Sequence, residues 1–330
     1  MIQPSERSER GPYGVGLRTL TLDDPHTPGR SFETDLWYPA AEPRNGPQAS
    51  HPFGQRHEAV EDLAARGETC PLAVFSHGNA GMRRQSTFLT THLASWGIAV
   101  VAPDHAGNTF HEMARITDEA ERISVHRSAR ENRPRDALAA VDAALNGAFG
   151  PIALESAHVA AIGHSFGGWT ATKLPGIDPR VRTVCALAPA SEAFIGRSAY
   201  RPGELPLPEA VATLVIAGID DVLVDLDLSV RPLVARLGPN TAAVGLIDAD
   251  HFHFCDGIEL LHAQHESNPR PGQPRATKAY AQSLPGHRAQ RAIRALTTSF
   301  CEASFSSRTT PSTGPTPDGL ATLDAAVRWL

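Results

Sequence analysis

Short apolar runs alternate with segments of helical spacing through most of this chain, and no other feature of the sequence constrains its fold as strongly. The apolar runs cover residues 71–76, 98–102, 158–162, 181–187, 211–217 and 242–247. The segments with helical spacing cover residues 88–96, 138–145 and 165–174, and a closing helix is expected over 286–301. Strands that are apolar on both faces are typical of a parallel sheet covered by helices. The sequence therefore predicts an α/β fold.

The remaining segments are expected to add a strand, three insertions and a tail to this sheet. Apolar and polar residues alternate over 32–38, which predicts a half-buried strand that ends at Pro39. We expect one large domain over residues 1–304, with insertions near 40–69, 189–210 and 264–285. Residues 305–319 are rich in Ser, Thr, Pro and Gly and predict a flexible linker. The tail 305–330 is expected to end in a short helix through Leu320, Leu323, Val327 and Leu330.

Composition and charge exclude several classes of protein. The 330 residues carry a formal net charge of −6 and contain no basic run of five or more, so a nucleic-acid partner is not expected. No stretch approaches 18 apolar residues, and the polar opening MIQPSERSER lacks the apolar core of a signal peptide. The four cysteines are scattered and form no CxxC pair, which favours reduced thiols and a cytoplasmic location. They are Cys70, Cys185, Cys255 and Cys301.

A Gly-x-Ser-x-Gly motif at 163–167 follows one of the predicted strands and opens a predicted helix. A serine on such a strained turn is lifted above the edge of the sheet, and glycines flank it because other side chains would collide. The helix that follows directs free N–H groups toward a reacting carbonyl. The pattern by itself is a weak signal in a chain with 27 glycines, but its strand–turn–helix context makes Ser165 a candidate nucleophile.

A second Gly-containing loop, at 76–81, follows the first buried run. An enzyme that transfers acyl groups must stabilise an oxyanion, and oriented backbone N–H groups do this well. One such donor is the residue after the nucleophile, here Phe166. Asn79 is the best candidate for the other donor, because Gly78 lets the backbone approach closely.

The acid and the base are expected at the ends of the last two strands, in the chain order Ser, acid, His. Asp221 follows the run 211–217 and is the preferred acid, with its neighbour Asp220 as the alternative. His251 follows the last run and is the preferred base, with His253 as the alternative. In an extended segment these two histidines would share a face but differ in reach, so only one could serve.

The same C-terminal segment also permits a metal hypothesis. Clustered His, Cys and Asp side chains can bind zinc, and the group consists of His251, His253, Cys255, Asp256 and His262. Their spacing fits no standard zinc motif, and the serine motif already accounts for one histidine. We therefore expect neither a metal nor a cofactor.

Taken together, these motifs resemble those of the bacterial esterases grouped with platelet-activating-factor acetylhydrolases and predicted dienelactone hydrolases. The resemblance covers most of residues 12–302 and rests on segments 14–22, 36–39, 76–79, 102–109, 133–136 and 163–168. It implies the α/β-hydrolase fold, with a mostly parallel sheet covered by helices and an N-terminal antiparallel hairpin. It also implies a triad of Ser165, Asp221 and His251, with Asn79 and Phe166 as oxyanion donors. True dienelactone hydrolases carry cysteine where this chain has serine, so that activity is not implied.

The expected function is that of a serine esterase that hydrolyses a small-molecule ester through an acyl-enzyme. The same triad would also serve an amidase, a lactonase or an acyltransferase, because fold does not fix the reaction. A dehalogenase is disfavoured, since such enzymes normally place Asp at the nucleophile position. A non-catalytic binding protein of this fold is the remaining alternative. The oligomeric state and the role of 189–210 as a lid stay open.

Overall fold

The computed structural model describes residues 4–41, 49–50, 54, 57–196, 199–269, 273, 276–306 and 323–330. The strands of this part are β1 (Gly14–Asp23), β2 (Ser31–Ala40), β3 (Val60–Glu61), β4 (Cys70–Ser76), β5 (Ala99–Pro103), β6 (Leu154–His164), β7 (Val181–Leu187), β8 (Ala212–Gly218), β9 (Thr241–Leu246) and β10 (Val327–Trp329). The α-helices are α1 (Thr87–Ser95), α2 (Phe110–Met113), α3 (Glu119–Leu145), α4 (Phe166–Lys173), α5 (Glu192–Ile195), α6 (Arg231–Leu237), α7 (Ile258–Ser267) and α8 (Gly286–Ser306). Short 3₁₀ turns include η4 (His251–Phe254) and η5 (Tyr280–Gln282).

All the described strands belong to one sheet, in the order β10-β9-β8-β7-β6-β4-β5-β2-β1-β3. The strands from β9 to β5 in this order run parallel to one another. β2 is antiparallel to β5, and β1 and β2 form the N-terminal antiparallel hairpin. The predicted fold class, a mostly parallel sheet with this hairpin, is confirmed. Because parallel strands end at the same edge, the loops after β4, β6, β8 and β9 meet there.

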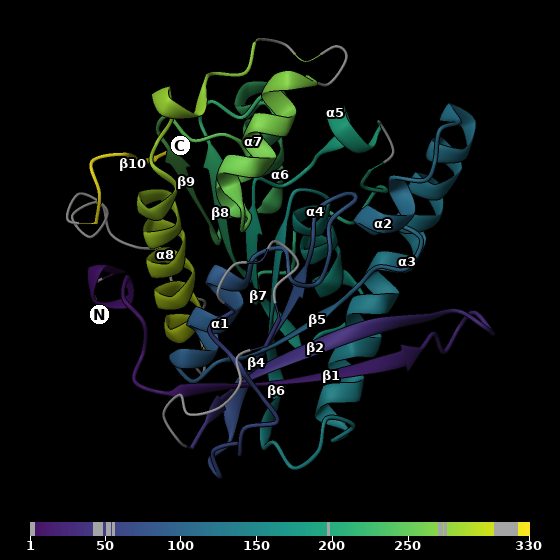
Figure 1. The fold of residues 1–330 in the computed structure, drawn as a ribbon, viewed down its shortest axis with the longest axis vertical. Helices are drawn as coiled ribbons and strands as arrows, with labels where there is room; N and C mark the ends of the chain where they lie inside the picture. The colour runs from purple at the N-terminus through teal and green to yellow at the C-terminus, as the bar shows by residue number, and fades with distance from the viewer. Residues whose placement is uncertain are drawn as a thin grey trace.

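Helices cover both faces of the sheet and create two hydrophobic cores (Figure 1). One core packs α1 and α8 against the sheet, with Leu89, Leu93 and Ile293 among its buried residues. The other packs α3, α4 and α6 against the opposite face, with Trp169 and Leu233 among its members. Each parallel strand is therefore buried on both sides, which explains why its sequence is apolar without alternation.

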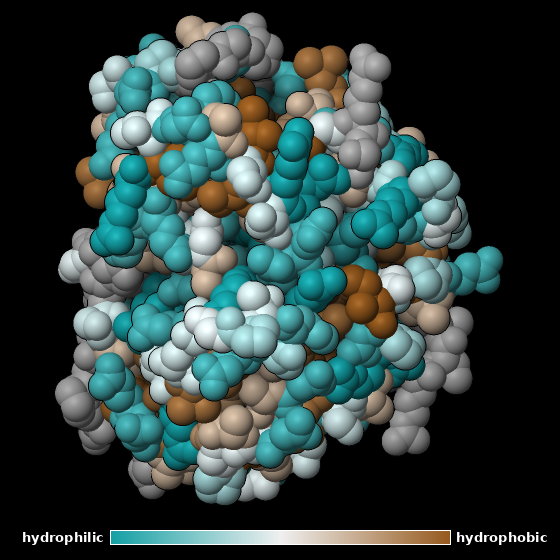
Figure 2. Space-filling view, turned by 90° about the vertical axis from the view of Figure 1, so that its right-hand side faces the viewer, coloured by the Kyte–Doolittle hydropathy of each residue, from teal (hydrophilic) through white to brown (hydrophobic). Residues whose placement is uncertain are grey.

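The face on the right of Figure 1, over α2 and α3, is mostly hydrophilic (Figure 2). Hydrophobic side chains on it form small separate groups, and Phe110 of α2 and Ile123 of α3 are 49% and 45% exposed. None of the described helices is long and apolar enough to cross a membrane. All four cysteines are free and buried.

The C-terminal helix predicted from the sequence is wrong over the described residues 323–330, where the chain instead forms β10. Val327 pairs with Leu246 and Trp329 with Val244, so the short strand continues the sheet beyond β9. The apolar spacing resembles a helical stripe, but pairing with the open edge of β9 outweighs this local preference. The predicted linker 305–319 lies outside the described residues except for 305 and 306, which end α8.

Two further predictions from the sequence differ in detail from the structure. β2 is buried on both sides from Thr34 onward rather than half-buried, because Trp37 packs in one core while Leu36 and Tyr38 pack in the other. Its Asp35 is fully buried in an ion pair with Arg84, with Nε to Oδ2 at 2.5 Å. The predicted excursion 264–285 contains the end of α7, a helix that the sequence reading did not identify.

Candidate active site

Ser165 lies on a sharp turn between the end of β6 and the start of α4. Its φ of 56° and ψ of −118° are unusual for a residue with a side chain, and strained positions of this kind concentrate at functional sites. The two flanking glycines are required by close contacts. A Cβ on Gly163 would lie 2.1 Å from the carbonyl oxygen of Gly167, and one on Gly167 would lie 1.8 Å from that of Ser76. The turn predicted from the motif is therefore present.

Asp221 and His251 lie together, as the preferred assignments require. Nδ1 of His251 donates to Oδ2 of Asp221 at 2.7 Å, and the carboxylate is almost fully buried. The other carboxylate oxygen accepts from the N–H groups of Leu223 at 2.8 Å and Val224 at 2.7 Å. These bonds fix the carboxylate toward the ring, and the carboxylate fixes the imidazole tautomer. Asp220 instead pairs with Lys278.

His253 points elsewhere. The segment is the 3₁₀ turn η4 rather than an extended strand, so the expectation that both histidines share a face is wrong. Asp250 begins this turn by accepting from the N–H of Phe252 at 3.0 Å. Nε2 of His253 donates to the carbonyl of Leu284 at 2.8 Å, and its Nδ1 lies 3.0 Å from Asp250. The geometry leaves His251 as the histidine paired with the buried acid beside the serine loop.

Ser165 and His251 line one cavity of about 220 Å³. The helices α2, α5 and α7, which Figure 1 shows at the same end of the sheet, contribute Phe110, Phe194 and Leu261 to it. Its other apolar lining residues include Ala80, Met82, Leu223 and Phe252. Among the described residues that line it, none is Asp, Glu, Lys or Arg. The cavity is therefore small and apolar, and it favours an uncharged group next to Ser165.

The predicted oxyanion donors border the same site. Asn79 lines the cavity, and Phe166 is the first residue of α4, whose first N–H groups have no acceptor within the helix. In the described part of the chain, neither N–H is engaged in another hydrogen bond. The side chain of Asn79 is tied back, since its Oδ1 accepts from Nδ2 of Asn108 at 3.0 Å. Both backbone donors are thus available to an oxyanion.

Arg133 holds the loop that carries Asn79. Its buried guanidinium donates to the carbonyl of His77 at 2.6 Å and to that of Gly78 at 2.8 Å. The Gly78 carbonyl belongs to the same peptide unit as the Asn79 N–H, so fixing one fixes the direction of the other. Burial lowers the pKa of Arg133 to about 9, which leaves it protonated near neutral pH. Asn108 completes the arrangement by accepting from Nε at 3.0 Å.

Sequence reasoning assigned no role to Arg133, although one signal was present. Arg133 lies on the buried stripe of α3, four residues from both Ala129 and Ala137. A basic residue in such a stripe must find partners inside the protein, because an unpaired buried charge is very costly. The stripe predicts burial of the guanidinium but does not identify the carbonyls that it binds.

Gln85 connects the oxyanion loop with the serine turn and was also missed. Its Oε1 accepts from the N–H of Gly78 at 3.0 Å, and its Nε2 donates to Nδ1 of His164 at 2.9 Å. The ring of His164 in turn packs against that of His251, with centroids 4.5 Å apart. Burial and the charge of His251 hold the pKa of His164 well below its usual value, so His164 stays neutral.

A second hydrogen-bonded series of Ser, His and Asp is present, but none of its three residues lines the cavity at Ser165. Nε2 of His105 is 2.8 Å from Oγ of Ser76, and its Nδ1 is 3.1 Å from Oδ2 of Asp136. All three side chains are nearly fully buried, and Arg30 also binds Asp136. Without access to a cavity this series cannot receive a substrate, and its role is to hold the core together.

The side chains considered as metal ligands form other interactions. Asp256 accepts from the first N–H groups of α1, at 2.5 Å from Thr87 and 3.1 Å from Phe88. His251 and His253 point to different partners, as described above. Among the described residues, no group of three His, Cys, Asp or Glu side chains could hold a metal ion.

Comparisons with known proteins bear on the fold and on the class of reaction. A ferulic acid esterase from Streptomyces cinnamoneus has a similar structure, with a TM-score of 0.67 and 21% sequence identity over 98% of this chain and 97% of that one. The fold is that of an α/β-hydrolase. Residues 54–133 match the sequence model of the family described as platelet-activating factor acetylhydrolase, isoform II. This match supports an esterase-like α/β-hydrolase, and its span includes Asn79 and Arg133. No curated protein matches the chain.

Proposed function

We propose that this α/β-hydrolase is a serine esterase in which Ser165 is the nucleophile, His251 the base and Asp221 the acid. The observation that carries the proposal is the 2.7 Å hydrogen bond between His251 and Asp221 at the cavity that Ser165 also lines. The similarity to the platelet-activating factor acetylhydrolase model supports ester hydrolysis as the reaction class.

The reaction proceeds by two acyl transfers. His251 takes the proton of Ser165 Oγ as this oxygen attacks the ester carbonyl, and Asp221 stabilises the imidazolium that forms. The N–H groups of Asn79 and Phe166 stabilise the oxyanion. The alcohol leaves with the proton from His251, and water then repeats the sequence on the acyl-enzyme. None of these steps requires a metal or a cofactor.

The substrate is a small neutral ester. A cavity of about 220 Å³ lies below the usual range for drug-sized ligands, so it holds a short acyl chain or a single ring. Its uncharged lining would leave a buried carboxylate or ammonium unpaired, which is costly. The buried free thiols are in keeping with the reducing cytoplasm as the location.

A panel of p-nitrophenyl esters tests this function. We expect acetyl and butyryl esters to be hydrolysed with a kcat/KM at least tenfold above that of the dodecanoyl ester, because the longer chain exceeds the cavity. Lactones, anilides and an added alcohol acceptor in the same panel separate the lactonase, amidase and acyltransferase alternatives. If no substrate reacts and a fluorophosphonate fails to label the protein, the non-catalytic alternative replaces the esterase.

The dependence of kcat/KM on pH should show one ionisation on the acid side. Protonated His251 cannot accept the Ser165 proton, so activity falls once acid protonates the imidazole. The neighbouring His164 adds no second step near neutral pH, because burial holds its pKa well below its usual value. Rates on p-nitrophenyl acetate between pH 4.5 and 8.5 measure this profile. A flat profile with chemistry rate-limiting would exclude a histidine base.

Arg133→Met should lower kcat by roughly 100-fold with a much smaller change in KM, because small displacements of a catalytic group can have effects of this size. The substitution releases the carbonyls of His77 and Gly78 and so frees the peptide that bears the Asn79 N–H. Arg127→Met is the matched control, since Arg127 is exposed on the same helix. Thermal unfolding of both variants shows whether the protein is folded. An unchanged kcat in folded Arg133→Met would exclude the positioning role.

A further inference from the structure

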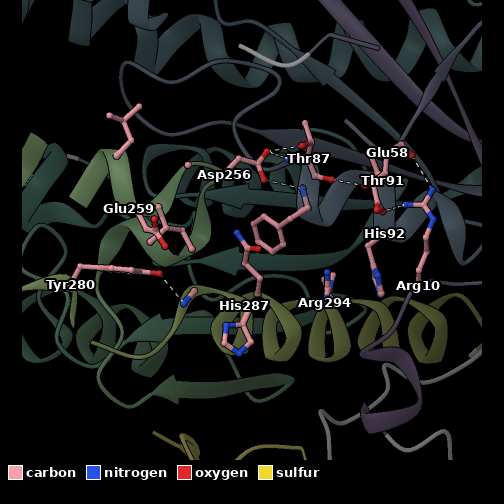
Figure 3. Close-up of a pocket in the computed structure, with 16 residues that line it drawn as sticks. Arg10, Glu58, Thr87, Thr91, His92, Asp256, Glu259, Tyr280, His287 and Arg294 are labelled. Carbon is pink, nitrogen blue, oxygen red and sulfur yellow. Dashed lines mark hydrogen bonds and ion pairs between the residues drawn. The ribbon is translucent and has the colours of Figure 1, made fainter. Parts of the chain in front are cut away.

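A second cavity of about 580 Å³ lies between α1 and α8, and it shares no lining residue with the cavity at Ser165. Figure 3 shows Arg10, Glu58 and Arg294 together at one end and Glu259 toward the other. The proposed esterase chemistry uses none of these side chains. The cavity is more than twice the volume of the one at Ser165, so its lining calls for a separate explanation.

Arg294 is the cation at this end that lacks a counter-ion. In the described part of the chain its guanidinium forms no ion pair, and its Nε is buried without a hydrogen-bond partner. Burial lowers the pKa of Arg294, while the charges of Glu9 and Glu58 raise it. A partly buried guanidinium without a counter-ion is unfavourable, and an anionic ligand that binds its terminal nitrogens reduces this cost.

The other charges around the cavity limit the ligand to a single negative charge. Arg10 forms an ion pair with Glu58, and its Nη2 also donates to the Glu58 carbonyl at 2.9 Å. Asp256 is bound by the first N–H groups of α1. His92 stays neutral, because burial and the charges of Arg294 and Arg10 hold its pKa at about 3. Arg294 is therefore the lining arginine without an ion pair among the described residues, and the carboxylates of Glu58, Asp256 and Glu259 would repel a dianion.

The lining also contains apolar side chains. Phe88, Ile258 and Leu260 line the cavity, and Leu260 is 50% exposed. A guanidinium binds a planar carboxylate through two parallel hydrogen bonds, which gives both strength and direction. We propose that the cavity binds a small organic monocarboxylate, with its carboxylate on Arg294 and its apolar body against Phe88. The site is separate from the proposed esterase site and does not depend on it.

Isothermal titration of the full chain with sodium benzoate tests the proposal. We expect saturable binding of one benzoate per chain, weakened by at least tenfold in Arg294→Gln, because a charge-assisted bidentate contact is lost. Arg288→Gln is the matched control: it removes a cation from the same helix, one that pairs with Asp324 outside the cavity. The affinity of this variant for benzoate should stay within twofold of wild type. Benzamide, the uncharged analogue, should bind at least tenfold more weakly than benzoate.

Three results would overturn the proposal. The first is no benzoate binding up to 10 mM, on the order of the weakest affinity expected of a one-charge site. The second is equal binding to wild type and Arg294→Gln. The third is loss of binding after a fluorophosphonate has blocked Ser165, which would place benzoate in the other cavity. Competition by inorganic sulfate, a dianion at neutral pH, would contradict only the restriction to a monoanion.

Arg294→Lys is a second test variant, used in case Arg294→Gln does not fold. It keeps the charge but not the paired donors, so it should bind benzoate more weakly than wild type and better than Arg294→Gln. Thermal unfolding without ligand identifies any unfolded variant. Hydrolysis of p-nitrophenyl acetate by Arg294→Gln should stay within twofold of wild type, and this separates failure of the carboxylate site from failure of the esterase site.

Discussion

Ser165→Ala is expected to lower kcat for ester hydrolysis by a factor of about 10⁶, the loss typical of removing a serine nucleophile. Alanine keeps the strained turn, since it removes only the hydroxyl and leaves the backbone bonds of residue 165 to Leu187 and Ala190 in place. The fold should therefore remain intact while the attacking atom disappears. Initial rates on p-nitrophenyl acetate, with thermal unfolding as the check on folding, measure the effect.

Ser76→Ala is the control that the structure itself supplies. Ser76 stands in the second hydrogen-bonded series of Ser, His and Asp, with its Oγ 2.8 Å from a histidine nitrogen, yet it borders neither cavity. The kcat of the Ser76→Ala variant should stay within about tenfold of wild type, because the Ser76 side chain forms hydrogen bonds only within the core. Equal activity of wild type and Ser165→Ala, or a comparable collapse in folded Ser76→Ala, would contradict the assignment of the nucleophile.

His251→Ala is expected to cost nearly as much as Ser165→Ala, about 10⁶ in kcat, because the residues of a triad act as a unit. Without the imidazole nothing accepts the proton of Ser165 or returns it to the leaving alcohol. The double variant should lose little more than either single variant, and this non-additivity is the signature of a shared step. Single-turnover rates of all three proteins measure it.

His253→Gln is the matched control for the histidine assignment. The glutamine amide can still donate to the Leu284 carbonyl that His253 contacts, so the fold should survive. We expect a kcat within about tenfold of wild type. A loss near 10⁶ in folded His253→Gln, with activity kept in His251→Ala, would show that the two histidines were assigned the wrong way round.

The parallel strands were predictable from the sequence because their burial leaves a direct mark on it. Residues 181–187 were expected as a strand and form β7 over the same span, since a strand covered on both faces admits few polar residues. The serine turn was equally predictable, because Gly163 and Gly167 are imposed by contacts below 2.2 Å. In both cases the local sequence and local steric contacts determine the structure.

The C-terminal strand was not predictable on the same grounds. Val327 and Trp329 pair with β9, a segment about 80 residues earlier. The spacing of the apolar residues near them does not indicate that partner. The short run 323–330 fits a helical stripe and an edge strand equally well. Only the presence of an open strand edge decides between them.

The choice between His251 and His253 also depended on structure that the sequence does not state. Spacing places both beyond the last strand, but their directions follow from the 3₁₀ turn that Asp250 begins. Arg133 acts through backbone carbonyls 55 and 56 residues earlier in the chain, and Gln85 through a ring nitrogen 79 residues later. Backbone groups are the same at every position, so no residue pattern reveals them.

Labelling with a fluorophosphonate, followed by peptide mass spectrometry, tests the central claim most directly. The reagent reacts with a serine only when a base activates it and an oxyanion site receives the phosphoryl oxygen. The account predicts one adduct per chain, on the peptide that contains Ser165, with loss of hydrolysis in proportion to labelling. An adduct on another residue, or full hydrolysis by a protein that carries no adduct after exposure to the reagent, would contradict it.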